Sequence, residues 1–128
     1  MPDRKILIVD DEPSIRKLLK MVFTTQGYAV SVAESAEQAL QIMEQDAYPV
    51  MFFDVNLPGM NGIDLCQRAK TADPKAIIYA ITGYTSEFEL TRCREAGFDD
   101  YFTKPAAMGD LIKAAEDGFE KNRRWESQ

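Results

Sequence analysis

Five short apolar runs recur along the chain and predict the strands of one sheet. They occupy residues 5–9, 28–32, 49–53, 76–81 and 99–102, and they are rich in Ile, Val, Phe and Tyr. Four of the five are apolar without alternation, which is typical of strands covered on both faces. Such strands belong to a parallel sheet with a layer of helices on each side.

The segments between these runs carry apolar residues at helical spacing. In the first segment, a single stripe is formed by Ile15, Leu18, Leu19, Val22 and Phe23. Further stripes lie at residues 36–43, 63–69, 90–96 and 111–119. Strand and helix therefore alternate five times. Because crossovers between parallel strands are right-handed, we predict an α/β fold with a doubly wound, five-stranded parallel sheet and helices on both faces.

The composition is that of one ordinary domain. The chain has 128 residues, and a domain of this size buries roughly two thirds of its extended surface without a disulfide or a metal. The formal net charge of −6 repels phosphate backbones and anionic membranes, so we expect neither direct nucleic-acid binding nor membrane association. No apolar run approaches about 18 residues and no secretory signal is recognisable, which favours a cytoplasmic location.

The residue types exclude several kinds of chemistry. The chain has no histidine, which removes Ser-His and Cys-His catalysis and histidine-ligated zinc. The two cysteines, Cys66 and Cys93, fall on the apolar stripes of predicted helices, so we expect buried thiols rather than reactive ones. Neither of the glycine-rich patterns that bind nucleotide phosphates is present, so nucleotide binding has little support.

Acidic side chains stand at the ends of two predicted strands. Asp10 and Asp11 follow the first strand, and Asp54 follows the third. In an open doubly wound sheet, ligands bind beyond the carboxyl ends of the strands. Any one of these residues alone is more simply explained as a helix cap or a turn former. If the two strands are neighbours, however, three carboxylates crowd together and destabilise one another unless a cation neutralises them, and this small all-oxygen ligand set favours Mg²⁺.

A hydroxyl and an ammonium group are expected on the same rim. Thr82 follows the fourth predicted strand, and Lys104 lies just beyond the fifth. A lysine and a threonine beside Mg²⁺ suit a phosphoryl group. Since no nucleotide-binding loop is present, the phosphoryl group would be held covalently by a carboxylate. Asp54 is the candidate nucleophile, because the adjacent pair Asp10 and Asp11 is better placed to hold the metal.

Four segments, taken in order, carry a family resemblance. Residues 6–12, 54–62, 81–84 and 99–105 together resemble the response-regulator receiver domain of two-component signalling, a CheY-like family, over nearly the whole chain. The resemblance implies a flavodoxin-like sheet with strand order 2-1-3-4-5. It also implies a phosphorylation-dependent switch that catalyses only its own phosphorylation and dephosphorylation. The implied partners are a sensor histidine kinase or phosphotransfer protein upstream, and a target protein or output domain downstream.

The resemblance also implies roles for individual residues. Asp54 matches the phosphoacceptor aspartate. Asp10 and Asp11 match the acidic pair that holds Mg²⁺ together with Asp54, and the backbone carbonyl of Asn56 matches a further metal ligand. Lys104 matches the lysine that pairs with the phosphoryl oxygens. The implied cofactor is therefore Mg²⁺.

Further matches concern switching and the lifetime of the signal. Thr82 matches the hydroxyl residue that moves to bond the phosphoryl group, and Tyr101 matches the aromatic residue that follows it inward. The surface made by the fourth helix, fifth strand and fifth helix would change as a result. Pro105 matches a proline that is usually cis in this family. Asn56 and Tyr84 match the residues that flank the approach of the hydrolytic water, and we expect the Tyr84 ring to shield the phosphoryl group and to prolong its lifetime.

The chain departs from the family pattern at two positions. Phe98 replaces a small residue, and Ala106 stands where an aromatic residue often follows the Lys-Pro pair. We expect both to lie on the output side of the domain. The receiver domain is predicted to span residues 1–122, followed by a polar C-terminal tail at residues 123–128.

Four alternatives stay open at this point. One is that the chain is the receiver part of a longer DNA-binding transcriptional regulator, although Leu90 and Ala114 occupy positions where dimerising relatives carry charges. A haloacid-dehalogenase-type phosphatase also uses an aspartyl phosphate, but it needs an acid/base aspartate where this chain has Asn56. A flavodoxin-like FMN binder needs a hydroxyl- and glycine-rich loop where this chain has Asp-Asp-Glu. A degenerate receiver that only docks partners is disfavoured, because no member of the acidic set is missing.

Overall fold

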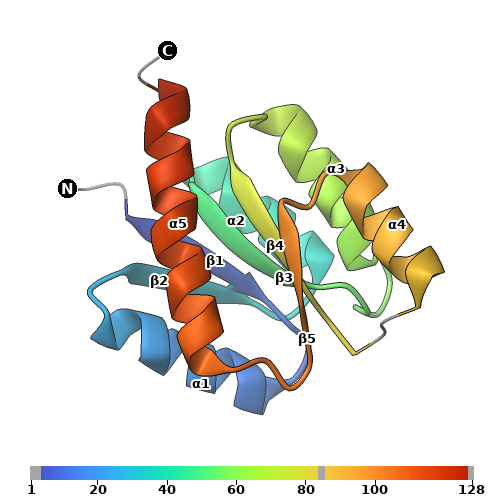
Figure 1. The fold of residues 1–128 in the computed structure, drawn as a ribbon, viewed down its shortest axis with the longest axis horizontal. Coiled ribbons are helices and arrows are strands. Elements are labelled where there is room, and N and C mark those ends of the chain that lie inside the picture. The colour runs from blue at the N-terminus through green and yellow to red at the C-terminus, as the bar shows by residue number, and fades with distance from the viewer. Residues whose placement is uncertain (1–3, 84–85, 127–128) are drawn as a thin grey trace.

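The computed structural model describes residues 4–83 and 86–126, and it shows strands and helices in strict alternation (Figure 1). The strands are β1 (Lys5–Val9), β2 (Ala29–Ala33), β3 (Val50–Asp54), β4 (Ile77–Thr82) and β5 (Asp100–Thr103). The helices are α1 (Pro13–Thr25), α2 (Ala36–Gln45), α3 (Gly62–Ala72), α4 (Glu87–Ala96) and α5 (Met108–Glu126). The predicted order of elements is therefore confirmed.

The five strands form one sheet in the order β2-β1-β3-β4-β5, with every neighbouring pair parallel. This is the predicted doubly wound topology. Four strands begin and end one residue later than the apolar pattern predicted. The reason is that strand ends are set by ladder pairing: Asp54 is paired with Ile81, and Thr82 with Thr103. Asp54 and Thr82 therefore belong to the rigid ends of strands rather than to the loops that follow.

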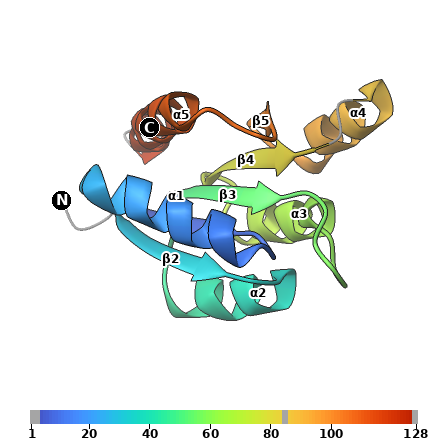
Figure 2. The ribbon, with the colours of Figure 1, turned by 90° about the horizontal axis from the view of Figure 1, so that it is seen from below.

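Helices cover both faces of the sheet and enclose two hydrophobic cores (Figure 2). Helices α1 and α5 pack on one face, where Leu19, Phe23 and Leu111 are buried against it. Helices α2, α3 and α4 pack on the other face. Burial on both faces explains why the strands read as continuous apolar runs.

Phe98 lies in the short connection between α4 and β5, and its expected place on the output side stays a prediction. Its ring is buried in the core beneath α3 and α4 and meets Phe53 edge to face, with the ring centroids 6.3 Å apart. A large apolar side chain at this position contributes packing energy. Ala106, in the loop between β5 and α5, packs against the core on the α1 and α5 side of the sheet.

The helix termini follow the local sequence. Ser35, Asn61 and Ser86 cap α2, α3 and α4 by accepting a hydrogen bond from a backbone N–H three residues on. Gly97 ends α4 in the left-handed conformation, with φ of 105°. Cys66 and Cys93 are buried as predicted, and burial raises the pKa of the Cys66 thiol to about 12.

Helix α5 continues to Glu126, so the polar segment that follows residue 122 is helical as far as that residue. The domain boundary at residue 122 stays a prediction. Within the part of the chain that the structure describes, no helix combines the length and the apolar character needed to cross a membrane.

Candidate functional site

Three carboxylates meet at the carboxyl end of the sheet. Asp10 follows β1 and Asp54 ends β3, and these strands are hydrogen-bonded neighbours. One oxygen from each of Asp10, Asp11 and Asp54 lies within 4.8 Å of the others. Asp10 and Asp54 are only 1% and 4% exposed, whereas Asp11 faces solvent. The convergence expected from the strand order is thus present.

Backbone amides hold one oxygen of each buried carboxylate. The N–H of Glu12 donates to Oδ1 of Asp10 at 2.9 Å, and the N–H of Asn56 donates to Oδ1 of Asp54 at 3.0 Å. The guanidinium of Arg16 donates to the backbone carbonyl of Asp10 at 2.8 Å. These contacts fix the orientation of both carboxylates and leave their Oδ2 atoms directed into the site.

The ammonium group of Lys104 lies next to these Oδ2 atoms. Its Nζ lies 3.2 Å from Asp10, 3.3 Å from Asp54 and 3.1 Å from the carboxylate of Glu12. Its own backbone N–H donates to the carbonyl of Thr82 at 2.8 Å, which ties the start of the loop after β5 to the end of β4. The peptide bond between Lys104 and Pro105 is cis, the isomer implied by the family resemblance.

The electrostatics of the site favour an added cation. Burial raises the pKa of Asp10 and of Asp54, and for Asp54 the nearby Asp10 carboxylate acts in the same direction. Burial alone would lower the pKa of Lys104, but its contacts with Glu12, Asp10 and Asp54 outweigh it and raise that pKa. Oδ2 of Asp10 is buried and accepts no hydrogen bond of good geometry, and Lys104 meets it only as an ion pair. One ammonium therefore does not balance the cluster, and the donor set fits a hard divalent cation such as Mg²⁺.

This imbalance predicts a pH-dependent and metal-dependent stability. Because the pKa of Asp10 is raised in the folded chain, its contribution to stability is greatest below pH 4 and is lost as the pH rises through the raised value. At pH 7.5 without metal, we expect Asp10→Asn to exceed the parent chain in free energy of unfolding by about 1–2 kcal/mol. The difference shrinks toward pH 4.

Urea denaturation at several pH values, with and without Mg²⁺, measures this effect. We expect Mg²⁺ to stabilise the parent and to have little effect on Asp10→Asn. Asp64→Asn, which changes an exposed carboxylate in α3, is the matched control and shows neither change. A difference between Asp10→Asn and the parent that is independent of both pH and Mg²⁺ would contradict this account.

Thr82 and Tyr101 lie on the same face of the sheet. Thr82 is buried at the end of β4, and Tyr101 on β5 is paired with Ala80, two residues before Thr82. Side chains two residues apart on a strand share a face, and Ala80 belongs to the core beneath α3 and α4. The Tyr101 side chain is 37% exposed, so it sits at the edge of that face. Tyr84 lies outside the described residues, so its expected shielding role stays a prediction.

Sequence reasoning missed a close backbone contact at Gly62. A Cβ atom at this position would lie 2.3 Å from the carbonyl oxygen of Asp54 and 2.9 Å from Cα of Val55. The N–H of Gly62 also donates to the carbonyl of Val55 at 3.0 Å. The first turn of α3 is thereby pressed against the strand end that carries Asp54. No local pattern reveals this contact, since it depends on how the loop of residues 55–61 folds back.

We expect Gly62→Ala to lower the free energy of unfolding by about 1–3 kcal/mol, because the methyl group displaces the Asp54 backbone. Gly109→Ala is the matched control: nothing lies within 4 Å of its Cβ, and it lies in helix α5. That variant is as stable as the parent or up to about 1 kcal/mol more stable. Urea denaturation compares the three chains, and equal stability of Gly62→Ala and the parent would show that the loop relaxes freely.

The fold and the site together define a class of protein, the flavodoxin-like α/β domains with an acidic site at the carboxyl end of a parallel sheet. Comparison with known families identifies one family within that class. Residues 6–116 match the response regulator receiver domain, and the chain belongs to this family. Receiver domains are the phosphoryl-accepting signalling switches of two-component systems. The prediction that this chain is such a receiver domain is therefore confirmed.

Individual relatives agree with this assignment. The chain is 35% identical over 109 residues to the DNA-binding response regulator MtrA of Mycolicibacterium smegmatis, which is 85% of this chain and 47% of that protein. It is 33% identical over 116 residues to sporulation initiation phosphotransferase F of Bacillus subtilis, covering 91% and 94% of the two chains. The chain thus spans about half of MtrA and nearly all of the second relative.

A solved structure confirms the fold. A CheY-like response regulator receiver domain protein from Methanospirillum hungatei superposes with a TM-score of 0.90 at 30% sequence identity. The match covers 94% of this chain and 97% of that one. The predicted strand order and the two helical layers are therefore those of the family.

Proposed function

We propose that this chain is a phosphorylation switch in which Asp54 accepts a phosphoryl group from a phosphohistidine of a sensor kinase or phosphotransfer protein. The observation that carries the proposal is the convergence of Asp10, Asp11 and Asp54 around the Lys104 ammonium at the carboxyl end of the sheet. Asp54 is the nucleophile because it ends the central strand β3, with a backbone amide orienting one oxygen. Asp10 and Asp11 would hold Mg²⁺ with Asp54 and the Asn56 carbonyl.

The transfer itself is a balanced substitution at phosphorus. A carboxylate oxygen of Asp54 forms a bond to phosphorus as the bond from phosphorus to the donor imidazole nitrogen breaks, and that nitrogen leaves with the bonding electrons. Bound Mg²⁺ supplies charge neutralisation for the phosphoryl oxygens. Lys104 contributes the second positive charge from its position 3.3 Å from Asp54. The N–H of Asn56 keeps the carboxylate oriented for attack.

The switch would operate through Thr82 and Tyr101. A phosphoryl group on Asp54 presents new acceptor oxygens next to the end of β4, where Thr82 lies. Movement of the Thr82 side chain toward those oxygens would open space over Ala80, on the face that Tyr101 shares. Inward movement of that ring would change the surface formed by α4, β5 and α5. This is a two-state element biased by a local change of charge.

A second candidate function is that the chain is the receiver part of a longer DNA-binding regulator. The observation that favours it is the match to MtrA, of which the chain covers 47%. Under this alternative the chemistry at Asp54 is unchanged, and the output is an attached domain. The net charge of −6 favours a DNA contact in that domain rather than in this chain.

The direct test of the proposed function is phosphoryl uptake by the purified chain. On incubation with acetyl phosphate and Mg²⁺, its intact mass is expected to increase by one phosphoryl group, and the group maps to Asp54. A chain that gains no phosphoryl group from acetyl phosphate or from a histidine-phosphorylated donor would overturn the proposal.

A further inference from the structure

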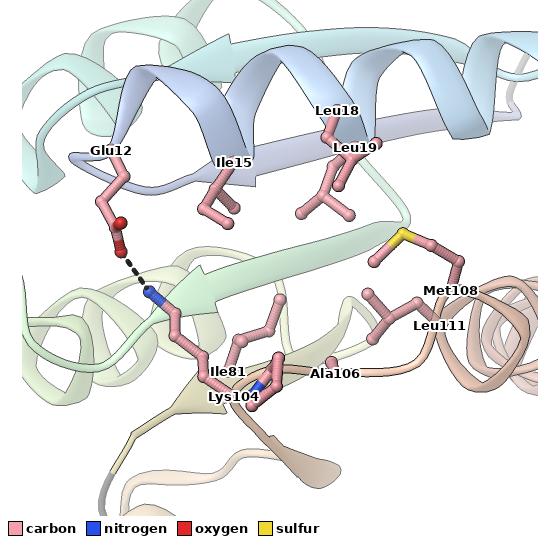
Figure 3. A pocket seen from close by; sticks show the side chains of 10 residues that line it. Glu12, Ile15, Leu18, Leu19, Ile81, Lys104, Ala106, Met108 and Leu111 are labelled. Carbon is pink, nitrogen blue, oxygen red and sulfur yellow. Dashed lines mark hydrogen bonds and ion pairs between the residues drawn. The ribbon is translucent and has the colours of Figure 1, made fainter.

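A pocket of about 400 Å³ lies beside the carboxylate cluster, between α1, the end of β4 and the loop that leads into α5 (Figure 3). Its inner wall is made by Leu19, Ile81 and Leu111, which are buried. Leu18 stands at its edge with 39% exposure. Small-molecule sites in proteins have volumes of about 300–1,000 Å³ and largely apolar walls. The size and lining of this pocket fall within that range.

Position 106, in the wall of the pocket, carries only a methyl group. Figure 3 shows Ala106 facing the pocket from the loop after Lys104, opposite the side chains of α1. The family resemblance implies that an aromatic residue often stands at this position, where this chain has alanine. A ring at position 106 would extend into the space between Ile15 and Leu111. The pocket therefore has room for a planar ring supplied by another molecule.

The polar end of the pocket has a definite charge preference. Glu12 and Lys104 line it and are joined by an ion pair of 3.1 Å (Figure 3). Lys104 is also in contact with Asp10 and Asp54, and Asp11 lies in the same cluster. Three carboxylates thus pair with the Lys104 ammonium, and the fourth, Asp11, lies in the same cluster. The excess of negative charge beside the pocket repels anionic molecules and attracts a cation. A bound divalent ion reduces this negative charge without reversing it.

We propose that this pocket binds a small aromatic amine, with its ring among the apolar side chains and its ammonium group on the carboxylate of Glu12. The ring buries apolar area against Leu19, Ile81 and Leu111, and the ammonium group pairs with the Glu12 carboxylate at the edge of the pocket. Pairing with the ligand draws Glu12 away from Lys104. Lys104 then pairs with Asp10 and Asp54 alone. The consequence for the reaction rests on the proposed function: phosphoryl uptake by Asp54 becomes faster, because the Lys104 charge is no longer shared with Glu12.

The binding test uses tryptamine and the full chain labelled at its methyl groups. We expect saturable shifts of the Ile15, Ile81 and Leu111 methyl signals with a Kd of about 1 mM, as for a ligand of twelve non-hydrogen atoms at ordinary ligand efficiency. Indole-3-propionate has the same ring and a carboxylate, and it binds at least about tenfold more weakly. Absence of saturable shifts, or equal binding of the acid and the amine, would overturn the site.

Variants locate the ligand within the pocket. Ala106→Phe fills the space and weakens tryptamine binding by at least about tenfold. Ala107→Phe adds the same ring at the neighbouring, exposed position and leaves binding unchanged. Glu12→Gln removes the partner of the ammonium without changing the apolar wall, so tryptamine and indole-3-propionate bind with similar affinity. Unaltered tryptamine binding in both Ala106→Phe and Glu12→Gln places the amine elsewhere and contradicts the assignment.

The effect on phosphorylation is measured separately, with acetyl phosphate and saturating tryptamine. The rate of phosphoryl uptake is expected to rise about two- to fivefold in the parent and to be unaffected in Ala106→Phe. Binding without a change in rate overturns the link between Glu12 and Lys104. Failure of the ligand-free chain to take up phosphoryl overturns the proposed function instead, and the binding result stands independently.

Discussion

An Asp54→Asn chain is expected to take up no phosphoryl group under conditions in which the parent chain is modified to a large extent. Asparagine has nearly the shape of aspartate and can still accept the hydrogen bond from Asn56 N–H, so the site is preserved. Its amide oxygen carries no negative charge and is a poor nucleophile, so the reaction is abolished rather than slowed. Intact mass spectrometry after incubation with acetyl phosphate and Mg²⁺ distinguishes the two chains directly.

Asp10→Asn separates the role of the metal from that of the nucleophile. It keeps Asp54 and removes one buried charge of the proposed Mg²⁺ site, so we expect phosphoryl uptake to slow by about 10²–10³-fold. Chelation with EDTA should have a comparable effect on the parent. Asp64→Asn serves as control and reacts at the parental rate, since its carboxylate is exposed on α3. A phosphoryl group gained by Asp54→Asn would show that the wrong nucleophile has been assigned, and a reaction insensitive to EDTA would contradict the role of Mg²⁺.

The fold was predictable because burial on both faces leaves a direct mark on the sequence. The run at residues 49–53 has no polar alternation, and β3 is the central strand of the observed sheet. The ends of strands were less predictable, since hydrophobicity does not report ladder pairing. Asp54 and Thr82 were expected directly after the apolar runs, and their pairing with Ile81 and Thr103 makes them the last residues of β3 and β4. The difference matters because a strand end holds a side chain more rigidly than a loop does.

The sequence predicted which residues form the candidate site, but it did not predict all the contacts between them. Asp10, Asp54 and Lys104 were found because parallel strands bring their carboxyl ends to one edge of the sheet. The ion pair between Glu12 and Lys104 was not foreseen, because it depends on side-chain orientation after β1. The same holds for the contact of Gly62 with Asp54, which is a close approach of two backbone segments. Local sequence encodes which element a residue joins, whereas contacts across elements emerge from packing.

Addition of beryllofluoride, which stands in for the phosphoryl group on Asp54, is expected to change the surface formed by α4, β5 and α5. The largest amide shifts should fall at Thr82, in residues 86–96 and in residues 99–119. The physical reason lies in the sheet register: Thr82 ends the strand next to β3, and Tyr101 shares its face from β5. Tyr101 is 37% exposed, so its ring has an outer position to leave when space opens over Ala80. Nuclear magnetic resonance of the labelled chain with Mg²⁺, beryllium and fluoride measures these shifts.

A pair of threonine variants isolates the hydroxyl that would start this movement. Thr82→Val keeps the branched shape of the buried side chain and removes its hydroxyl, so beryllofluoride still binds at Asp54 but the shifts around Tyr101 are largely lost. Thr103→Val makes the same change at the residue paired with Thr82 on β5, whose side chain is exposed, and retains the parental response. Shifts that persist around Tyr101 in Thr82→Val, or that fall only in α2 of the parent, would show that the change does not pass through Thr82. Loss of the response in Thr82→Val alone ties the surface change to a single hydroxyl at the end of β4.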